Sequence, residues 1–466
     1  MIHSYKLGGF NIILDAGSGS IHAADAAACD AICAYERAGA EAAAKYTGEK
    51  YAEIPESGIS ELIGEIEQLK SQGKLFAPDS FSTVAGTENK KTLKALCLNV
   101  SHACNMSCSY CFAGRGGYGG NRELMPYETG KRAIDFLIEN SGGHRNLDVD
   151  FFGGEPLLNW GAVKDIVRYA RKIESGSGKK FRFTLTTNGL LIDDDVIAFT
   201  NKEMHNVVLS LDGRPETNDA ARKLPGGGGS YQDVVPKFKR LAEARSGKGY
   251  YIRGTFTRNN LDFVNDILHI ADLGFTELSM EPAVAKPGEP HGLKTDDLAV
   301  LCEQYETLAY EMLKREKEGR PFTFYHYKLD LTGGPCIYKR IAGCGVGTEY
   351  LAVTPGGELY PCHQFVGNKG FLLGDIWRGI TRQDRRDEFY GRGIYSNTEC
   401  RECWARLYCS GGCAANAYNA TGSVAGIYSL GCELFKKRVE CAIMMKVAGS
   451  ARQLNERTEP CVPDTC

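Results

Sequence analysis

The sequence predicts an α/β protein built on a partial (βα)6 barrel of the TIM type, with a winged-helix-like N-terminal module and a cysteine-rich C-terminal domain. Three observations predict this architecture. Strand and helix patterns alternate between about residues 92 and 285, three cysteines follow the first of these strands, and twelve of the eighteen cysteines lie from Cys302 onward. A chain of 466 residues is too long for one compact core, so two or three domains are expected.

Composition and charge exclude several classes of function. The content of 43% hydrophobic and 24% charged residues is that of an ordinary soluble protein, and the net charge of -3 gives no argument for a nucleic-acid or membrane partner. We find no signal-peptide pattern and no run of eighteen apolar residues, so a cytoplasmic protein is expected. In a reducing cytosol, clustered cysteines bind metal more often than they form disulfides.

Residues 1–88 have a pattern of their own, in which short strands precede helices. This order predicts a small winged-helix-like module, and the alternative is a simple N-terminal cap on the barrel. The expected strands are Tyr5–Leu7, Phe10–Leu14 and Ser20–His22, and the expected helices are Ala26–Arg37 and Ile59–Gln72. The polar stretch Pro78–Lys91 is expected to be a linker.

Residues 89–290 are expected to form the barrel. Each βα unit takes roughly 30 to 50 residues, which requires parallel strands with right-handed crossovers. Six units rather than eight indicate an open barrel, which suits a large substrate such as a peptide. The expected strands are Leu93–Val100, Leu147–Phe152, Phe181–Thr187, Val207–Asp212, Tyr250–Phe256 and Glu277–Glu281. The expected helices are Pro126–Asn140, Gly161–Ile173, Asp194–Lys202, Tyr231–Ala244 and Leu261–Leu273.

The character of the sequence changes after the barrel. Residues 291–335 are expected to form a bridging region around the long helix Asp296–Gly319. Residues 336–440 are cysteine-rich, with short strands and turns, and residues 441–466 are expected to be a C-terminal tail. Cys461 and Cys466 lie in this polar tail, and no role is assigned to them.

The cysteine loop Cys104-x3-Cys108-x2-Cys111 follows the first barrel strand, where α/β barrels place their chemistry. A loop of this length can turn three thiolates onto one iron–sulfur cube, which leaves one iron free to bind a small molecule. A zinc site is the first alternative, but zinc prefers four ligands, often as two CxxC pairs. Three unrelated core thiols are the second alternative. The spacing and the position after a strand favour the cluster.

Polar residues at the ends of the next strands form a candidate ligand site. Two glycines after the second strand allow a ligand to approach the backbone, and a carboxylate beside them can accept a hydrogen bond from an ammonium group. Hydroxyl and amide groups at later strand ends suit a ribose and a carboxylate, which an arginine can bind bidentately. The residues are Gly153, Gly154, Glu155, Asn188, Ser210, Asp212 and Arg253.

A second cysteine pattern lies in the C-terminal third. It reads Cys400-x2-Cys403-x5-Cys409-x3-Cys413, followed by Cys432, and it is preceded by Cys344 and by Gly357-Glu-Leu-Tyr-Pro-Cys362. A zinc ribbon is the alternative, but seven positions suit two further iron–sulfur clusters better. Cys29, Cys33, Cys97 and Cys302 lie on patterned elements and are expected to be ordinary buried thiols.

The loop Cys104–Cys111, followed by Phe112, resembles the cluster loop of the radical S-adenosylmethionine (SAM) enzymes, and the C-terminal pattern resembles their SPASM extension. The resemblance implies that Cys104, Cys108 and Cys111 hold a 4Fe–4S cluster whose open iron binds SAM. The reduced cluster then cleaves SAM to a 5′-deoxyadenosyl radical, which abstracts hydrogen from a C–H group. The residues expected to contact SAM are Phe112, Gly153, Gly154, Glu155, Asn188, Ser210, Asp212 and Arg253.

The resemblance also divides the C-terminal cysteines between two auxiliary 4Fe–4S clusters. Cys400, Cys403, Cys409 and Cys432 hold one cluster, and Cys344, Cys362 and Cys413 hold the other. The fourth ligand of the second cluster is either Cys336 or a thiolate of the substrate, because the spacing before Cys344 departs from that of the sulfatase-maturing relatives. An open position suits a thioether-forming enzyme, since iron binding deprotonates and positions a cysteine.

The whole chain resembles the SPASM-type radical SAM maturases that install thioethers in cysteine-rich SCIFF (ranthipeptide) precursors. Gly9–Asn11, Gly345–Pro355 and Cys362–Phe365 carry this closer match. It implies a partner peptide whose leader adds a strand to the N-terminal module. It also implies an electron donor such as flavodoxin or ferredoxin. Sulfatase maturation and peptide epimerisation share the same motifs. A redox-sensing regulator would need a basic recognition helix, which Ala26–Arg37 is not.

Overall fold

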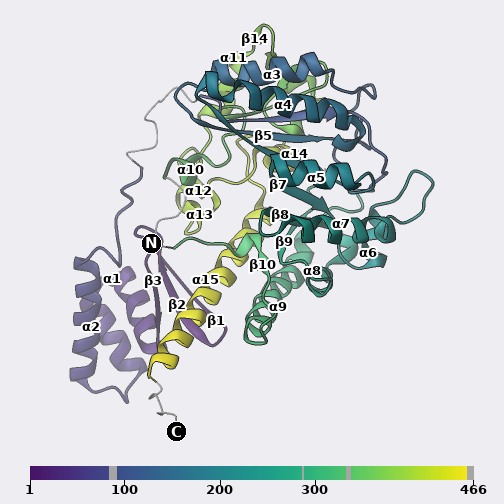
Figure 1. The fold of residues 1–466 in the computed structure, drawn as a ribbon. Coiled ribbons are helices and arrows are strands. Elements are labelled where there is room, and N and C mark those ends of the chain that lie inside the picture. The colour runs from purple at the N-terminus through teal and green to yellow at the C-terminus, as the bar shows by residue number, and fades with distance from the viewer. Residues whose placement is uncertain (83–91, 286–287, 332–336, 459–466) are drawn as a thin grey trace, which may run out of the picture.

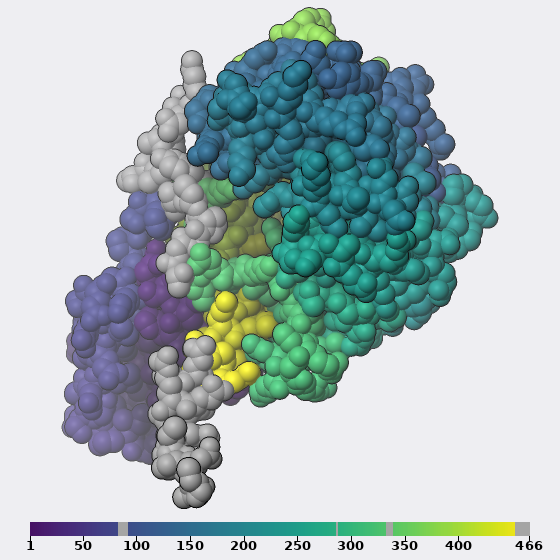
Figure 2. Space-filling model, viewed as in Figure 1, coloured from purple at the N-terminus to yellow at the C-terminus, as the bar shows by residue number. Residues whose placement is uncertain are grey.

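The computed structural model describes residues 1–82, 92–285, 288–331 and 337–458. Figure 1 shows a small N-terminal module beside a large sheet covered by helices, with the C-terminal helix lying between them. In Figure 2, green and yellow atoms of the C-terminal third lie between the purple module and the teal barrel. Cys336, Cys461 and Cys466 lie outside the described residues.

The N-terminal module is a three-stranded antiparallel sheet followed by two helices. The strands are β1 (Ile2–Leu7), β2 (Phe10–Asp15) and β3 (Ile21–Ala24), and the helices are α1 (Ala26–Lys50) and α2 (Glu56–Ser71). Gly8 and Gly9 turn β1 into β2 with φ of 63° and 82°. The expected order of strands and helices is confirmed for these residues. Its winged-helix character stays a prediction.

Six parallel strands form the barrel, as the sequence predicts. They are β4 (Ala95–Ser101), β5 (Asn146–Gly153), β6 (Lys180–Thr187), β7 (Met204–Ser210), β8 (Gly249–Phe256) and β9 (Glu277–Pro282). Each strand pairs with its neighbours in chain order, and the short strand β10 (Thr323–Phe324) pairs with β9 at the far edge. All six strands therefore end at the same edge of the sheet, where ligands bind in such folds.

Helices cover one face of this sheet (Figure 1). They are α3 (Tyr127–Asn140), α4 (Trp160–Ser177), α5 (Asp194–Glu203), α6 (Pro215–Ala221), α7 (Tyr231–Arg245), α8 (Phe263–Asp272) and α9 (Leu298–Lys317). Every second residue of a strand faces them, so Val149 and Phe151 of β5 and Phe183 of β6 are completely buried. The hydrophobic core thus lies between the sheet and the helices, and the other face is left for the site.

The C-terminal third continues the barrel sheet. Strand β11 (Tyr350–Val353) pairs in parallel with β4, and Ala95 lies opposite Tyr350. Three antiparallel strands follow: β12 (Glu358–Tyr360), β13 (Gly374–Asp375) and β14 (Gly379–Ile380). The short helices of this region are α10 (Ile337–Ala342), α11 (Gln383–Tyr390), α12 (Thr398–Arg401), α13 (Arg406–Cys409) and α14 (Ala414–Thr421). Within the described residues, barrel and cysteine-rich region share one eleven-stranded sheet.

A long C-terminal helix, α15 (Ser429–Thr458), runs through residue 440, where the sequence pattern placed the end of the cysteine-rich domain. It packs against α9, β1 and β2, and buries Leu434, Cys441 and Met444. Tyr5 of β1 donates a hydrogen bond to the Glu440 carbonyl at 3.0 Å. The helix therefore joins the N-terminal module to the barrel. Among the helices of the described residues, α15 included, none is both long and apolar enough to cross a membrane.

Candidate functional site

The cysteine loop lies at the carboxyl end of β4 and is held by hydrogen bonds of its backbone. The His102 N–H donates to the Glu123 carbonyl at 2.7 Å, and the Ser109 N–H donates to the Ala221 carbonyl at 3.0 Å. Cys104, Cys108 and Cys111 are all half-buried. The loop therefore has a fixed backbone, as a metal-binding loop requires.

The three thiols are close enough for their charges to interact. Burial raises the pKa of Cys104 to about 12, and the charges of Cys108 and Cys111 add to this effect. Buried thiolates of this kind need a nearby cation, which a cluster of iron ions supplies. Among the described residues, no three metal-binding side chains converge on a single ion. A cube is bound differently, because each thiolate takes a separate iron. The donor set thus fits a three-cysteine cluster.

The two glycines of the Gly-Gly-Glu-Pro motif allow the backbone after β5 to pack on the cysteine loop. A Cβ atom at Gly154 would lie 2.2 Å from the Ala103 carbonyl oxygen, and one at Gly153 would lie 2.3 Å from the Ser101 carbonyl oxygen. The Gly154 N–H donates to this Ser101 carbonyl at 2.7 Å. The sequence analysis explained these glycines by the approach of a ligand. In the structure, backbone atoms of the cysteine loop instead occupy the space that a Cβ atom at either glycine would need.

Glu155 links the ends of β5 and β6. Its carboxylate is 1% exposed and accepts hydrogen bonds from the Thr187 hydroxyl at 2.7 Å and the Asn188 N–H at 2.8 Å. The side chain of Asn188 in turn donates to Asn105 of the cysteine loop at 2.8 Å and lies 3.7 Å from the Cys104 sulfur. Glu155 therefore positions Asn188 beside the loop. Contact of either residue with SAM stays a prediction.

Burial raises the pKa of Glu155 from 4.5 to about 7, against the hydrogen bonds that it accepts. The unfolded chain releases this proton at lower pH than the folded chain does. We therefore expect the free energy of unfolding to fall by on the order of 3 kcal/mol as pH rises from about 4.5 to 7, and Glu155→Gln to remove this part of the slope. Urea unfolding of the metal-free chain at several pH values measures it.

The control for this experiment is Glu128→Gln, because the Glu128 side chain on α3 is 78% exposed. We expect this variant to keep the pH slope of the wild type. An unchanged slope in Glu155→Gln would show that Glu155 does not titrate in this range.

Asp212 follows β7 and is completely buried. Its carboxylate accepts hydrogen bonds from the Tyr110 hydroxyl at 2.6 Å and from the Thr255 N–H at 2.9 Å, and it forms an ion pair with Arg222 at 3.0 Å. Because Tyr110 lies between Cys108 and Cys111, its hydrogen bond to Asp212 helps to hold the cysteine loop in place. The sequence analysis placed Asp212 in the site but missed Tyr110 and Arg222.

Polar side chains line the face of the sheet that the helices leave free. In β5 the half-buried Asp150 and Phe152 alternate with buried apolar residues, so they point to this concave face. Ser210 and Arg253 lie opposite each other on β7 and β8 at its carboxyl end. Burial raises the pKa of Asp150 to about 6. Ser210 and Arg253, which the sequence analysis placed in the site, therefore share this face with Asp150. The sequence analysis missed Asp150, although the alternation of polar and apolar residues in its strand indicates which face it lies on.

Glu281 at the end of β9 also belongs to this face. Its carboxylate lies 3.3 Å from His326 and 3.5 Å from Arg438 of α15. Burial alone would raise its pKa, but the charges of His326, Arg438 and Arg253 hold it below the ordinary value. Burial lowers the pKa of His326 to about 4, so the carboxylate of Glu281 and the two arginine cations are the charges at this border. Such a face can bind a polar substrate.

An aromatic group, Phe112, Tyr118, Phe152 and His363, joins the cysteine loop to the C-terminal third. The Phe112 ring lies 5.6 Å from the His363 ring and 6.1 Å from the Tyr118 ring. The Tyr118 hydroxyl donates to the Gly153 carbonyl at 3.2 Å, and its pKa is raised by burial and by the charges of cysteines in both regions. Phe112 is 51% exposed, so part of its ring is free for a ligand.

The C-terminal cysteines gather in two groups. Burial raises the pKa of Cys432 to about 12, and the charges of Cys409, Cys400 and Cys403 add to it. Burial likewise raises the pKa of Cys362 to about 12, with the charge of Cys413 and, more weakly, that of Cys344 adding to it. These are the two sets into which the resemblance divides the C-terminal cysteines, and their binding of clusters stays a prediction. Cys97 is completely buried beside Cys362, as expected of a core thiol.

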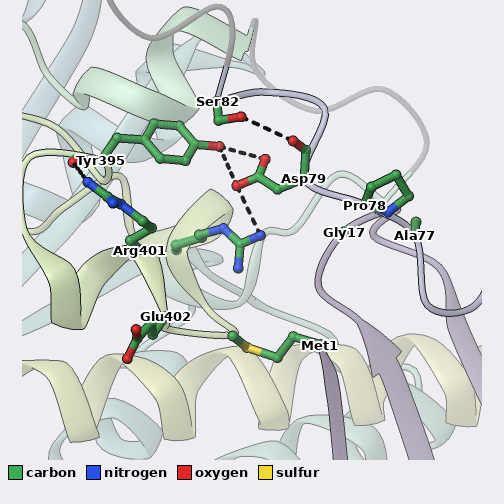
Figure 3. A pocket seen from close by; sticks show the side chains of 10 residues that line it. Met1, Gly17, Ala77, Pro78, Asp79, Ser82, Tyr395, Arg401 and Glu402 are labelled. Atoms are coloured by element: carbon green, nitrogen blue, oxygen red, sulfur yellow. Dashed lines mark hydrogen bonds and ion pairs between the residues drawn. The ribbon is translucent and has the colours of Figure 1, made fainter. Parts of the chain in front are cut away.

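A cavity of about 670 Å³ lies between the N-terminal module and the segment that carries Cys400, Cys403 and Cys409 (Figure 3). Asp79 accepts a hydrogen bond from the Tyr395 hydroxyl at 2.7 Å and lies 3.4 Å from Arg406. Met1, Arg401 and Glu402 also line the cavity. Through these contacts, Asp79 links the segment that follows the N-terminal module to the segment that carries Cys403 and Cys409.

Comparison with known proteins agrees with this geometry. Residues 98–266 match the family model of the Radical SAM superfamily. The chain is 21% identical over 378 residues to the radical SAM cyclopropyl synthase TigE of Paramaledivibacter caminithermalis, which covers 75% of this chain and 74% of TigE. It is 25% identical over 342 residues to the cysteine-type anaerobic sulfatase-maturating enzyme of Clostridium perfringens, which covers 69% of this chain and 88% of that enzyme.

Solved structures share the fold. The native enzyme anSMEcpe with bound AdoMet and the Kp18Cys peptide superposes with a TM-score of 0.61 at 22% identity, covering 77% of this chain and 99% of that one. SuiB of Streptococcus suis, bound to its precursor peptide SuiA, superposes with a TM-score of 0.51 at 17% identity, covering 91% of this chain and 97% of SuiB. The three-cysteine loop, the fold and these matches lead to one conclusion: residues 98–266 form a domain that matches the Radical SAM superfamily, in a chain that is similar to radical SAM enzymes such as a cyclopropyl synthase and a sulfatase-maturating enzyme.

Proposed function

We propose that this chain joins a cysteine sulfur to a carbon atom within a cysteine-rich precursor peptide, as in the SCIFF (ranthipeptide) family. The observation that supports this most is the aromatic group around Phe112 and Tyr118. It connects the Cys104–Cys111 loop to Cys362, which follows strand β12 of the same sheet. A site for hydrogen abstraction and a site for a substrate thiolate would then lie next to each other.

Three 4Fe–4S clusters are part of this proposal. Cys104, Cys108 and Cys111 would hold the cluster that binds SAM, and the groups around Cys432 and Cys362 would hold the auxiliary clusters. The described residues provide three cysteines for the Cys362 group, namely Cys344, Cys362 and Cys413. The fourth ligand is either Cys336, which lies outside the described residues, or the thiolate of the substrate.

The chemistry follows from what each part contributes. When bound, SAM and a reduced cluster supply a 5′-deoxyadenosyl radical. The polar concave face, with Asp150, Arg253 and Glu281, would orient the peptide, and the aromatic group would keep water out. Forming the thioether removes a hydrogen atom from carbon and a proton from sulfur, so one further electron must leave. The auxiliary cysteines would hold its acceptor, and a flavodoxin or ferredoxin would supply the electron that starts the reaction.

The peptide would enter along the N-terminal module. Among the described residues, strand β3 is an edge of the three-stranded sheet, so a leader peptide can pair with its outer side. The side chains of His3 and Tyr5 on the opposite edge strand, β1, are occupied by Glu440 of α15. SuiB, which binds the precursor peptide SuiA, has a similar fold. The cavity in Figure 3 lies between the module and the cysteine-rich region and would accept the segment that follows the leader.

Incubation with a cysteine-rich precursor peptide encoded near this chain's gene tests the proposal. Under anaerobic conditions with SAM and a reductant, we expect the peptide to lose about 2 Da for each thioether formed. Tandem mass spectrometry locates the link, and replacing the linked cysteine by serine should abolish it. An unchanged mass with an inverted residue would instead identify an epimerase. Formylglycine in a sulfatase peptide, with no thioether, would identify a sulfatase maturase.

A further inference from the structure

Arg222, at the end of α6, is a buried cation beside the cysteine loop. Its side chain is 10% exposed, and its Nε lies 3.0 Å from the Asp212 carboxylate. The guanidinium carbon lies 5.7 Å from the centre of the Tyr110 ring, and the Tyr110 hydroxyl donates to the same carboxylate. Arg222, Asp212 and Tyr110 thus form one charged network against the segment that contains Cys108 and Cys111.

Backbone hydrogen bonds fix Arg222 relative to Cys108. The Ser107 N–H donates to the Lys223 carbonyl at 2.8 Å, and the Ser109 N–H donates to the Ala221 carbonyl at 3.0 Å. The residues on both sides of Cys108 are therefore bound to the residues on both sides of Arg222. The position of Arg222 relative to Cys108 is therefore set by backbone hydrogen bonds as well as by side-chain contacts.

The two charges of the network act on Cys108 in opposite directions. The Arg222 guanidinium and the Asp212 carboxylate carry opposite charges, and both lie against the segment that contains Cys108 and Cys111. In a buried site of low dielectric constant, fixed charges of this kind are weakly screened.

We propose that Arg222 is a positioning residue that raises the reduction potential of the cluster bound by Cys104, Cys108 and Cys111, and that Asp212 opposes it. This inference rests on the proposed cluster. Reduction adds one negative charge to the cluster, so a fixed cation beside a ligand sulfur stabilises the reduced form, and a fixed anion destabilises it. Charges and hydrogen bonds near the sulfurs are known to set cluster potentials in this way.

The test measures potentials rather than turnover. The full chain is loaded with iron and sulfide anaerobically and titrated with reductant in the absence of peptide, and the electron paramagnetic resonance signal that changes on adding SAM identifies the cluster concerned. We expect Arg222→Gln to change the ratio of reduced to oxidised cluster at least tenfold at a fixed potential. This is a negative shift of about 59 mV for one electron. Asp212→Asn should shift the potential in the positive direction, and Arg222→Lys should restore most of the wild-type value.

Arg245→Gln is the matched control. Arg245 is a buried arginine of the same barrel, 1% exposed, and it donates to the carbonyls of Thr200, Met204 and Gly249, far from the cysteines in sequence. We expect its loss to leave the potential unchanged even where stability falls. Equal potentials in Arg222→Gln and wild type, or shifts of the same sign in Arg222→Gln and Asp212→Asn, would overturn the inference.

These outcomes separate this inference from the proposed function. A wild-type chain without a SAM-responsive cluster would overturn both. A normal cluster and a modified peptide with no dependence of the potential on Arg222 would overturn the inference alone.

Discussion

Replacing Cys104, Cys108 or Cys111 by alanine is expected to reduce the release of 5′-deoxyadenosine from SAM to background. Each thiolate supplies one of only three protein ligands to the cube, and the remaining two cannot hold it at the carboxyl end of β4. Release is measured by chromatography after anaerobic incubation with a reductant. Iron analysis of the same samples should give about twelve iron atoms for the wild type and about eight for each variant.

Cys29→Ala is the matched control for these variants. Cys29 is a buried thiol on α1, 6% exposed, and belongs to the core of the N-terminal module. We expect this variant to keep all of its iron and its full SAM cleavage. Full cleavage by Cys104→Ala, Cys108→Ala or Cys111→Ala would refute the assigned cluster and the radical chemistry that depends on it.

Gly154→Ala is expected to abolish SAM cleavage, although only one methyl group is added. The new Cβ would lie 2.2 Å from the Ala103 carbonyl oxygen and 3.0 Å from Cα of Gly116. Both neighbours are backbone atoms, so the cysteine loop itself must move. Overpacking of this kind costs about 1–3 kcal/mol of folding free energy, and the displaced Cys104 would no longer hold its iron. Iron content and 5′-deoxyadenosine release measure the two effects.

Gly161→Ala provides the comparison, because nothing lies within 4 Å of a Cβ at this position in α4. Alanine favours a helix, so we expect a gain of up to about 1 kcal/mol in unfolding free energy and full SAM cleavage. If Gly154→Ala behaved like Gly161→Ala, the close packing of the loop on the Gly-Gly-Glu-Pro motif would not be required for function.

The barrel could be predicted from the sequence because its signals are local. Residues 147–152 and 181–187 alternate between the helix-covered and the free face, and each strand is separated from the next by a recognisable helix. The pairing of β11 with β4 has no local pattern in the sequence that would predict it, since it joins segments far apart in the chain. Helix α15 was missed because its charged residues Lys437 and Glu440 lie partly within the interface, where Lys437 pairs with both Glu440 and Glu306.

The same distinction holds for the candidate site. The spacing of Cys104, Cys108 and Cys111 identifies a cluster loop because three ligands must reach one cube. Arg222 lies in an irregular segment, where neither periodicity nor spacing indicates its contact with Asp212 and Tyr110. The role of Gly154 also needs the structure, because only the positions of neighbouring backbone atoms show why a side chain is excluded.

The parallel pairing of β4 with β11 has a consequence for synthesis on the ribosome. The strand that leads to the cysteine loop exposes one unpaired edge until residues 350–353 have been made, because its partner comes that late in the chain. Exposed strand edges attract other chains, and such distant contacts form slowly. The nascent barrel is therefore expected to be prone to aggregation until β11 pairs with β4. Iron should accordingly enter the first loop only after residues 350–353 have been made and have paired.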